Sequence, residues 1–201
     1  MSNQSRFDEL LQRLRDTEKE LENEMERLLE EKREKFHYHL EHGKVRFEQQ
    51  VEALQRQYRI GTWRYLHRAK WRFILTAPII YGMIIPIVIM DISFTLYQHI
   101  CFRVYGIPRV KRGDFLVIDR HLLSYLNAIE KFNCVYCGYG NGIIAYAREI
   151  TARTEQFWCP IKHAKRTTGL HPRTGKFFEY GDASAWHSEL KKMRKDWQDE
   201  P

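Results

Sequence analysis

Cysteine, proline and glycine are scarce in this chain, and each scarcity excludes a class of structure. Only four of the 201 residues are cysteine, and three of them fall in one ligand-like pattern, which argues against a disulfide framework and for a reducing compartment. Residues 6–60 contain no proline and a single glycine, Gly43, so little there interrupts a long helix. The Walker, nucleophile-elbow and dinucleotide-binding patterns are absent, so those motifs identify no enzyme class here.

Charge is missing from residues 73–102, where Asp91 and His99 are the only groups that ionise near neutrality. The stretch from Phe73 to Met90 is eighteen uncharged residues, and a helix needs roughly 17–25 apolar residues to cross a bilayer. The sequence therefore predicts a membrane segment at residues 73–102.

Basic and aromatic residues flank this segment on both sides. The predicted interface residues are Arg64, Arg68, Lys70, Trp71, Arg72, Arg103 and Arg109. Cations meet lipid phosphates while indoles lie at headgroup depth, so residues 61–72 are interpreted as an interfacial linker. The same composition suits nucleic acid, but the adjoining apolar run favours lipid as the partner.

The flanking charge also predicts the topology. Because both flanks are positive, the inside rule favours a cytoplasmic position for both. Pro78, Gly82 and Pro86 permit a bend, so we expect a kinked hairpin that dips into one leaflet and keeps Asp91 near an interface. A single span is the alternative.

The N-terminal region, residues 1–60, has the pattern of a coiled coil. Apolar residues recur with four-three spacing, interrupted by Glu18, at Phe7, Leu11, Leu14, Leu21, Met25 and Leu28. The frame slips near residues 32–39 and resumes at Leu40, so the helix either carries a stutter or folds back around His42 and Gly43. An apolar seam of this kind predicts a homo-oligomer or a protein partner.

Residues 103–181 contain the pattern of a metal site. Cys134 and Cys137 form a Cys-x2-Cys pair, and Cys159 and His163 form a Cys-x3-His pair. Zinc is the expected ion for such a set, with iron or an iron–sulfur cluster as the alternative and His171 as the alternative fourth ligand. Gly138, Gly140 and Gly142 are interpreted as a loop around the first pair. A closed four-ligand site predicts a structural role.

Two further groups of residues are candidates for chemistry or binding. Asp119, Arg120 and His121 could act on a lipid headgroup, although a capped helix start explains them more simply. The face with Arg148, Glu149, Arg153 and Glu155 is interpreted as ion-paired. Residues 182–201 predict a basic amphipathic helix capped by Asp182.

The segment NCVYCGYGNGIIAYAREITARTEQFWCPIKH, with TLYQHICFRVYGIPRV before it, resembles bacterial membrane-associated proteins of no assigned function. The resemblance implies no activity. The expected fold is mainly α, with a coiled-coil helix, a membrane anchor or hairpin, a small helical Cys3His domain and a C-terminal amphipathic helix. The expected function is a non-enzymatic, membrane-anchored adaptor at the cytoplasmic face of a bacterial inner membrane. The alternatives are a redox module at the same ligands and a lipid-active enzyme.

Overall fold

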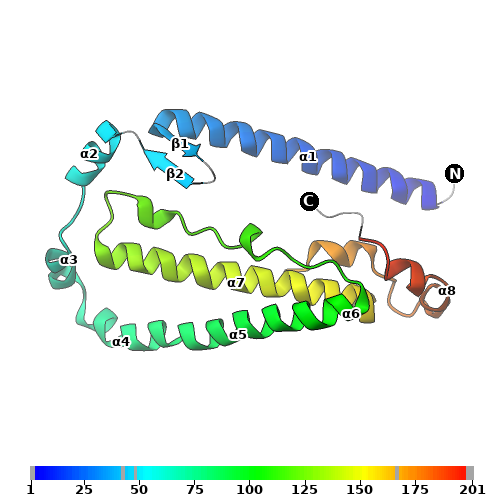
Figure 1. Ribbon diagram of the computed structural model, residues 1–201. Coiled ribbons are helices and arrows are strands. Elements are labelled where there is room, and N and C mark those ends of the chain that lie inside the picture. Colours follow the sequence, from blue (N-terminus) through cyan, green and yellow to red (C-terminus); the bar gives the residue numbers. More distant parts are fainter. Residues whose placement is uncertain (1–2, 42–43, 48, 166–167, 198–201) are drawn as a thin grey trace. The chain divides into compact units, whose positions relative to one another are not determined.

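The computed structural model describes residues 3–41, 44–47, 49–165 and 168–197 (Figure 1). These residues are mainly helical, as the sequence predicts. They form two compact units. The first is Met1–Gly61 with Leu122–Asn127, and the second is Thr62–His121 with Ala128–Pro201.

The first unit begins with one long helix, α1 (Asn3–Phe36). Ion pairs between residues three or four positions apart support its surface, for example Arg33 with Glu30 at 2.6 Å. The helix ends where His37 takes a left-handed conformation with φ of 51°, which stops the helical path.

The prediction of continued helix beyond residue 37 is wrong. Strands β1 (Tyr38–Glu41) and β2 (Lys44–Phe47) follow α1 and pair antiparallel, with Tyr38 opposite Phe47. The antiparallel pairing reverses the chain direction, as the fold-back alternative required, but with strands in place of helix. The predicted turn residues, His42 and Gly43, lie outside the described residues. Val45 and Phe47 alternate with charged residues, which is the two-residue period of a strand. In this segment that period overrides the helical spacing of apolar residues from which a helix was predicted. Helix α2 (Gln49–Gln57) follows.

In the second unit, α3 (Thr62–Arg68) leads into a nearly unbroken helical run, Trp71–Tyr105. Its parts are α4 (Trp71–Gly82), α5 (Ile84–Tyr97), the π-helical turn η1 (Gln98–Phe102) and α6 (Arg103–Tyr105). Figure 1 shows α4 and α5 continuing in one direction. The predicted hairpin within residues 73–102 is therefore wrong.

The proline and glycine residues of this run do not turn the chain. Met83 keeps a right-handed helical conformation, and its N–H bonds to the carbonyl of Ile80. Pro86 lies in the first turn of α5, where a missing N–H costs little. The run of 35 residues is thus about 52 Å long at 1.5 Å per residue.

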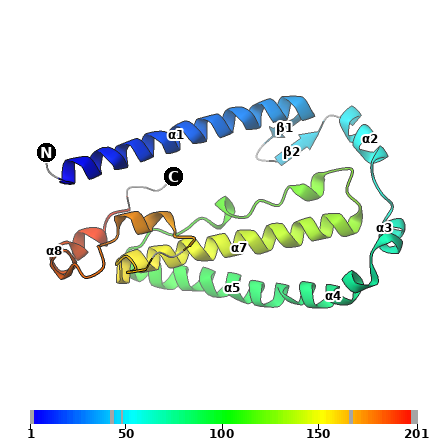
Figure 2. The same cartoon turned by 180° about the vertical axis from the view of Figure 1, so that it is seen from behind.

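Helix α7 (Ala128–Trp158) lies beside α5 and runs parallel to it, as both views show (Figures 1 and 2). The order of the contacts gives the direction. Tyr81 bonds to Asn133, and Tyr97 bonds to Thr154, at 2.6 and 3.1 Å. Two parallel neighbours need a returning connection, and residues 106–121 run back along α7 as part of it. This return segment includes the short 3-10 turn η2 (Arg112–Asp114) and the first two residues of η3 (Arg120–Leu122).

The core of the second unit lies where α5, the return segment and the second half of α7 meet. Its buried members are Phe102, Ile107, Val110, Tyr146 and Ile150. Beyond α7, η4 (Pro172–Lys176) and α8 (Ala183–Met193) cover the end of that helix. Helix α7 ends before Cys159 and Pro160. As predicted, Asp182 caps α8 by accepting a 2.9 Å hydrogen bond from Ala185 N–H.

Candidate functional site

The predicted metal ligands do not meet. Cys134 and Cys137 lie one turn apart within α7, and Cys159 directly follows the end of that helix. The helical rise places Cys159 more than about 30 Å from the pair, whereas zinc holds sulfur at about 2.3 Å. Among the described residues, no three His, Cys, Asp or Glu side chains are grouped to hold an ion. The Cys3His interpretation is therefore corrected.

The local chemistry of the cysteines agrees with this separation. All four cysteines are free. Burial raises the pKa of the Cys159 thiol, and the nearby Glu155 carboxylate raises it further, which disfavours the thiolate that a metal or a redox reaction requires. The part of the chain that the structure describes therefore brings together no ligand set for zinc, iron or an iron–sulfur cluster.

Helix packing explains the glycines that were interpreted as a loop. Gly138, Gly140 and Gly142 are buried within α7. A Cβ on Gly142 would lie 2.7 Å from the carbonyl oxygen of Phe115, and one on Gly138 would lie 3.3 Å from that of Val117. Glycine at 138 and 142 therefore lets the backbone of the return segment lie directly on the helix. Small residues four apart are a known signature of close backbone approach, and this signal was present in the sequence.

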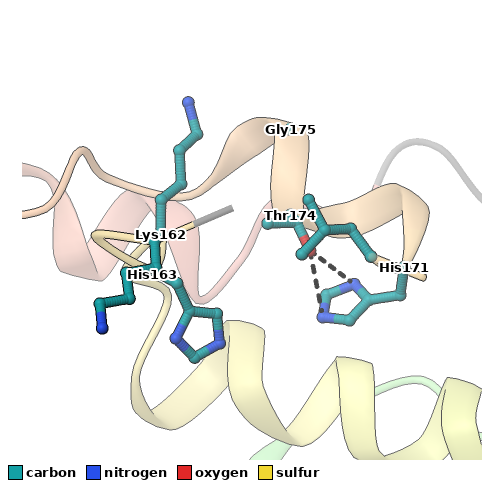
Figure 3. Close-up of a pocket in the computed structure, with 7 residues that line it drawn as sticks. Lys162, His163, His171, Thr174 and Gly175 are labelled. Atoms are coloured by element: carbon teal, nitrogen blue, oxygen red, sulfur yellow. Dashed lines mark hydrogen bonds between the residues drawn. The ribbon is translucent and has the colours of Figure 1, made fainter. Parts of the chain in front are cut away.

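His163 and His171 line one open pocket of about 270 Å³ with Lys162, Lys165, Leu170, Thr174 and Gly175. Figure 3 shows the two imidazole rings on opposite sides of it. The His171 ring is engaged by Glu155, with Nε2 and Oε2 2.8 Å apart. Two lysines at the rim make this pocket a poor site for a metal cation.

The Asp119, Arg120 and His121 group has no catalytic arrangement. Asp119 directly precedes η3, a 3-10 turn of three residues that contains Arg120 and His121; the next helix begins only at Ala128, so the predicted helix start at Asp119 is not confirmed. The ring nitrogen Nδ1 of His121 is buried without a hydrogen-bond partner, and no bond joins it to Asp119 in the described structure. An acid–base pair needs such contact or a water between its members.

The feature that does stand out is the exposed surface of the run Trp71–Tyr105, which takes in one side of α5 and almost the whole circumference of α4. Large apolar side chains cover it without interruption by Asp, Glu, Lys or Arg between Phe73 and Phe102. We call this the apolar face, and its residues are Phe73, Ile74, Leu75, Ile79, Ile80, Met83, Ile85, Val88, Ile89, Ile92, Leu96, Ile100 and Val104. Ile79 is 73% exposed and Ile92 is 63% exposed. This helix is long and apolar enough to cross a membrane.

The opposite side of the same helix carries the polar groups. Asp91 faces the return segment, where Arg112 donates two hydrogen bonds to its carboxylate at 3.1 and 2.7 Å. Tyr139 of α7 donates a third at 2.9 Å. Gln98 is buried and bonds the Val110 backbone at 2.9 and 3.3 Å. The charge in the centre of the run therefore points away from the apolar face.

The predicted interface residues gather at the two ends of this run. Arg64 and Arg68 lie in α3, Lys70 and Arg72 lie beside Trp71 at the start of α4, and Arg103 and Arg109 lie at the other end. All seven are exposed. The apolar face is thus bordered by cations at both ends.

A second charged cluster fixes the C-terminal part to α7. Glu149 accepts hydrogen bonds from Arg153 at 2.9 Å and from Arg173 at 2.7 and 3.0 Å. Burial raises the pKa of the Glu149 carboxyl, but these bonds outweigh it and hold the pKa below its usual range. The predicted ion pairing on this helix is confirmed for Glu149 and Arg153. The role of Arg173 follows from the fold and not from a sequence pattern.

Comparison with known proteins gives no relative: no family model, curated protein or solved structure matches this chain.

Proposed function

We propose that this protein is a non-enzymatic scaffold, anchored to a membrane by the apolar face and carrying α1 as an arm for self-association. The observation that carries the proposal is the continuous apolar face exposed along the length of Trp71–Tyr105. Single exposed apolar residues are ordinary on soluble proteins, whereas a large contiguous patch indicates an interaction surface. The cations and tryptophan at its ends favour lipid as that surface's partner.

We propose further that the helix lies within one leaflet and does not cross the bilayer. A spanning position would place the return segment, with Asp114, Asp119 and Arg120, at membrane depth beside α7. Irregular backbone exposed to hydrocarbon is not tolerated, and each charged side chain at the bilayer centre costs roughly 2.5–3.5 kcal/mol or more.

An in-plane position avoids these costs. The apolar face enters the lipid, and Asp91, Arg112 and the outer surface of α7 remain on the water side. The length of the run, about 52 Å, also exceeds the hydrocarbon thickness of about 30 Å, which is no obstacle for a helix parallel to the surface. Both positive flanks then lie on one side of the membrane, as the inside rule favours.

The arm for self-association is α1. Leu21, Met25 and Leu28 of the predicted seam are exposed, and the side chains of Phe7, Leu11 and Leu14 lie outside the described residues. An apolar stripe with charged flanks gains stability by packing against a partner helix. The support for a second copy as partner is the four-three spacing of that stripe.

Self-association is tested with two neighbouring substitutions. Leu28→Glu places a charge in the seam, whereas Leu29→Glu places the same charge on an exposed position beside it. We expect the detergent-solubilised full chain to form an oligomer that Leu28→Glu converts to monomer and Leu29→Glu leaves intact. Light scattering coupled to size exclusion gives the mass. A monomeric unsubstituted protein, or an equal effect of the two changes, would refute α1 as a self-association arm.

A further inference from the structure

A pocket of about 510 Å³ lies at the end of the membrane-facing run, apart from the sites considered above. Tyr105 and Gly106 contribute the end of α6, and Phe157 contributes the end of α7. The remaining wall comes from α8 and the residues after it, and consists of Lys191, Arg194, Lys195 and Trp197. The pocket therefore combines three aromatic walls with three cations.

Arg194 is fixed in this pocket. Its Nε donates a 2.8 Å hydrogen bond to the carbonyl of Phe157, and its guanidinium lies 5.0 Å from the centre of the Phe157 ring. Both contacts orient a planar group that has five N–H donors. Its terminal nitrogens have no hydrogen-bond acceptor among the described residues, so they are free to bind an anion.

The positive charge of the pocket is uncompensated in the described structure. Lys191 and Lys195 are exposed and form no ion pair with any described acidic residue. The carboxylate of Asp196, which lies between Lys195 and Trp197 in the sequence, faces Lys176 at 3.5 Å. Three cations around one cavity favour a ligand that carries phosphate, since guanidinium and ammonium groups both bind phosphate oxygens.

The position of the pocket indicates where that phosphate comes from. Tyr105 directly follows Val104, the last residue of the apolar face, which is 75% exposed. The exposed indole of Trp158 stacks edge-on with Tyr105, with ring centroids 5.3 Å apart. Tyrosine and tryptophan of this kind lie at headgroup depth in membrane proteins. A helix with its apolar face in the lipid would hold this cavity at the level of the phosphates.

We propose that this pocket binds the phosphate of an anionic phospholipid headgroup, with Arg194 as its fixed donor and Lys191 and Lys195 as charge partners. The proposal rests on the proposed membrane anchoring and adds the ligand class to it. The aromatic walls contact the glycerol and first acyl carbons, so the same ligand satisfies both parts of the pocket.

The test is flotation of the full-length protein with vesicles of phosphatidylcholine alone and with vesicles that also contain phosphatidylglycerol, whose negative surface potential attracts basic segments. We expect binding to both, with a preference for the anionic vesicles. Lys191→Gln should reduce that preference about fivefold, since a lysine at a lipid surface contributes about 1 kcal/mol. Lys192→Gln is the matched control, because it removes the same charge from the next position of α8 and does not line the pocket.

The outcomes separate this inference from the anchoring itself. Binding to neither vesicle would contradict the anchoring. Equal binding to both vesicles, or equal effects of the two substitutions, would contradict the pocket alone. A third measurement tests free phosphate: inorganic phosphate is titrated into the solubilised protein, and binding is followed by calorimetry. Phosphate binding that Lys191→Gln weakens, without any preference for anionic vesicles, would assign the pocket to free phosphate and overturn the lipid proposal.

Discussion

Replacing Ile85 and Ile92 together with aspartate is expected to release the protein from membranes. Both side chains are 63% exposed on the apolar face, so the substitutions remove no core contact. Burying an isoleucine contributes about 1.5–3 kcal/mol, and two losses of at least that size lower the membrane partition by roughly 100-fold or more, at 1.4 kcal/mol for each factor of ten. Aspartate is chosen because its short side chain cannot reach the headgroups as lysine can.

Two single substitutions, one on the apolar face and one outside it, provide the control for this prediction. Ile92→Asp is compared with Ile144→Asp, since Ile144 is also exposed, on α7, where its helical neighbours are Asn141 and Arg148. Flotation should show a large loss for the first change and little for the second. Equal losses would mean that the apolar face is not the part of the unit that enters lipid.

Gly142 should be the least tolerant of the three α7 glycines. Gly142→Ala places a Cβ 2.7 Å from the Phe115 carbonyl oxygen and 3.2 Å from the Leu116 Cα, and backbone atoms of this kind cannot rotate away. Overpacking costs typically 1–3 kcal/mol, which exceeds the helix-propensity gain of about 1 kcal/mol. The larger Gly142→Leu should detach the return segment from α7.

Gly140→Ala is the matched control, because its Cβ would meet only the Ile87 Cδ1 atom at 3.4 Å. That is an ordinary contact, so the propensity gain remains and stability should stay equal or rise. The melting temperature in one detergent compares the variants, with roughly 2–4 °C expected for each kcal/mol in a chain of this size. Equal melting temperatures for the alanine variants would contradict the close packing of the return segment on α7.

The same glycines show where sequence reasoning succeeded and where it did not. A mainly helical chain, the apolar run, the cap at Asp182 and the end of α7 before Pro160 were all predictable, because each depends on local composition. The helical role of the glycines was missed although Gly138 and Gly142 have the four-residue spacing of small packing residues, because glycine is equally common in loops and its place in this helix depends on a neighbouring backbone that occupies the space of its Cβ. That neighbour, Phe115, lies 27 positions away in the sequence.

The prediction of a metal site was wrong for a related reason. Two ligand pairs can meet only if the residues between them fold back. The residues between Cys137 and Cys159 instead belong to one continuous helix. The parallel packing of α5 on α7 likewise depends on tyrosine contacts such as Tyr139 with Asp91, 48 residues apart, that no local pattern reveals. The local sequence therefore does not reveal which side of α5 faces α7 and which side is exposed and apolar.

The central claim is that Trp71–Tyr105 lies in one leaflet with both of its ends on one side. It is tested most directly by replacing the four native cysteines with serine and introducing Arg68→Cys or Arg109→Cys, which lie at opposite ends and are exposed. A membrane-impermeant maleimide is then applied to sealed vesicles of each orientation. The in-plane helix predicts that both cysteines are labelled in the same vesicle orientation. Labelling of the two cysteines in opposite orientations would establish a spanning helix and contradict the proposal.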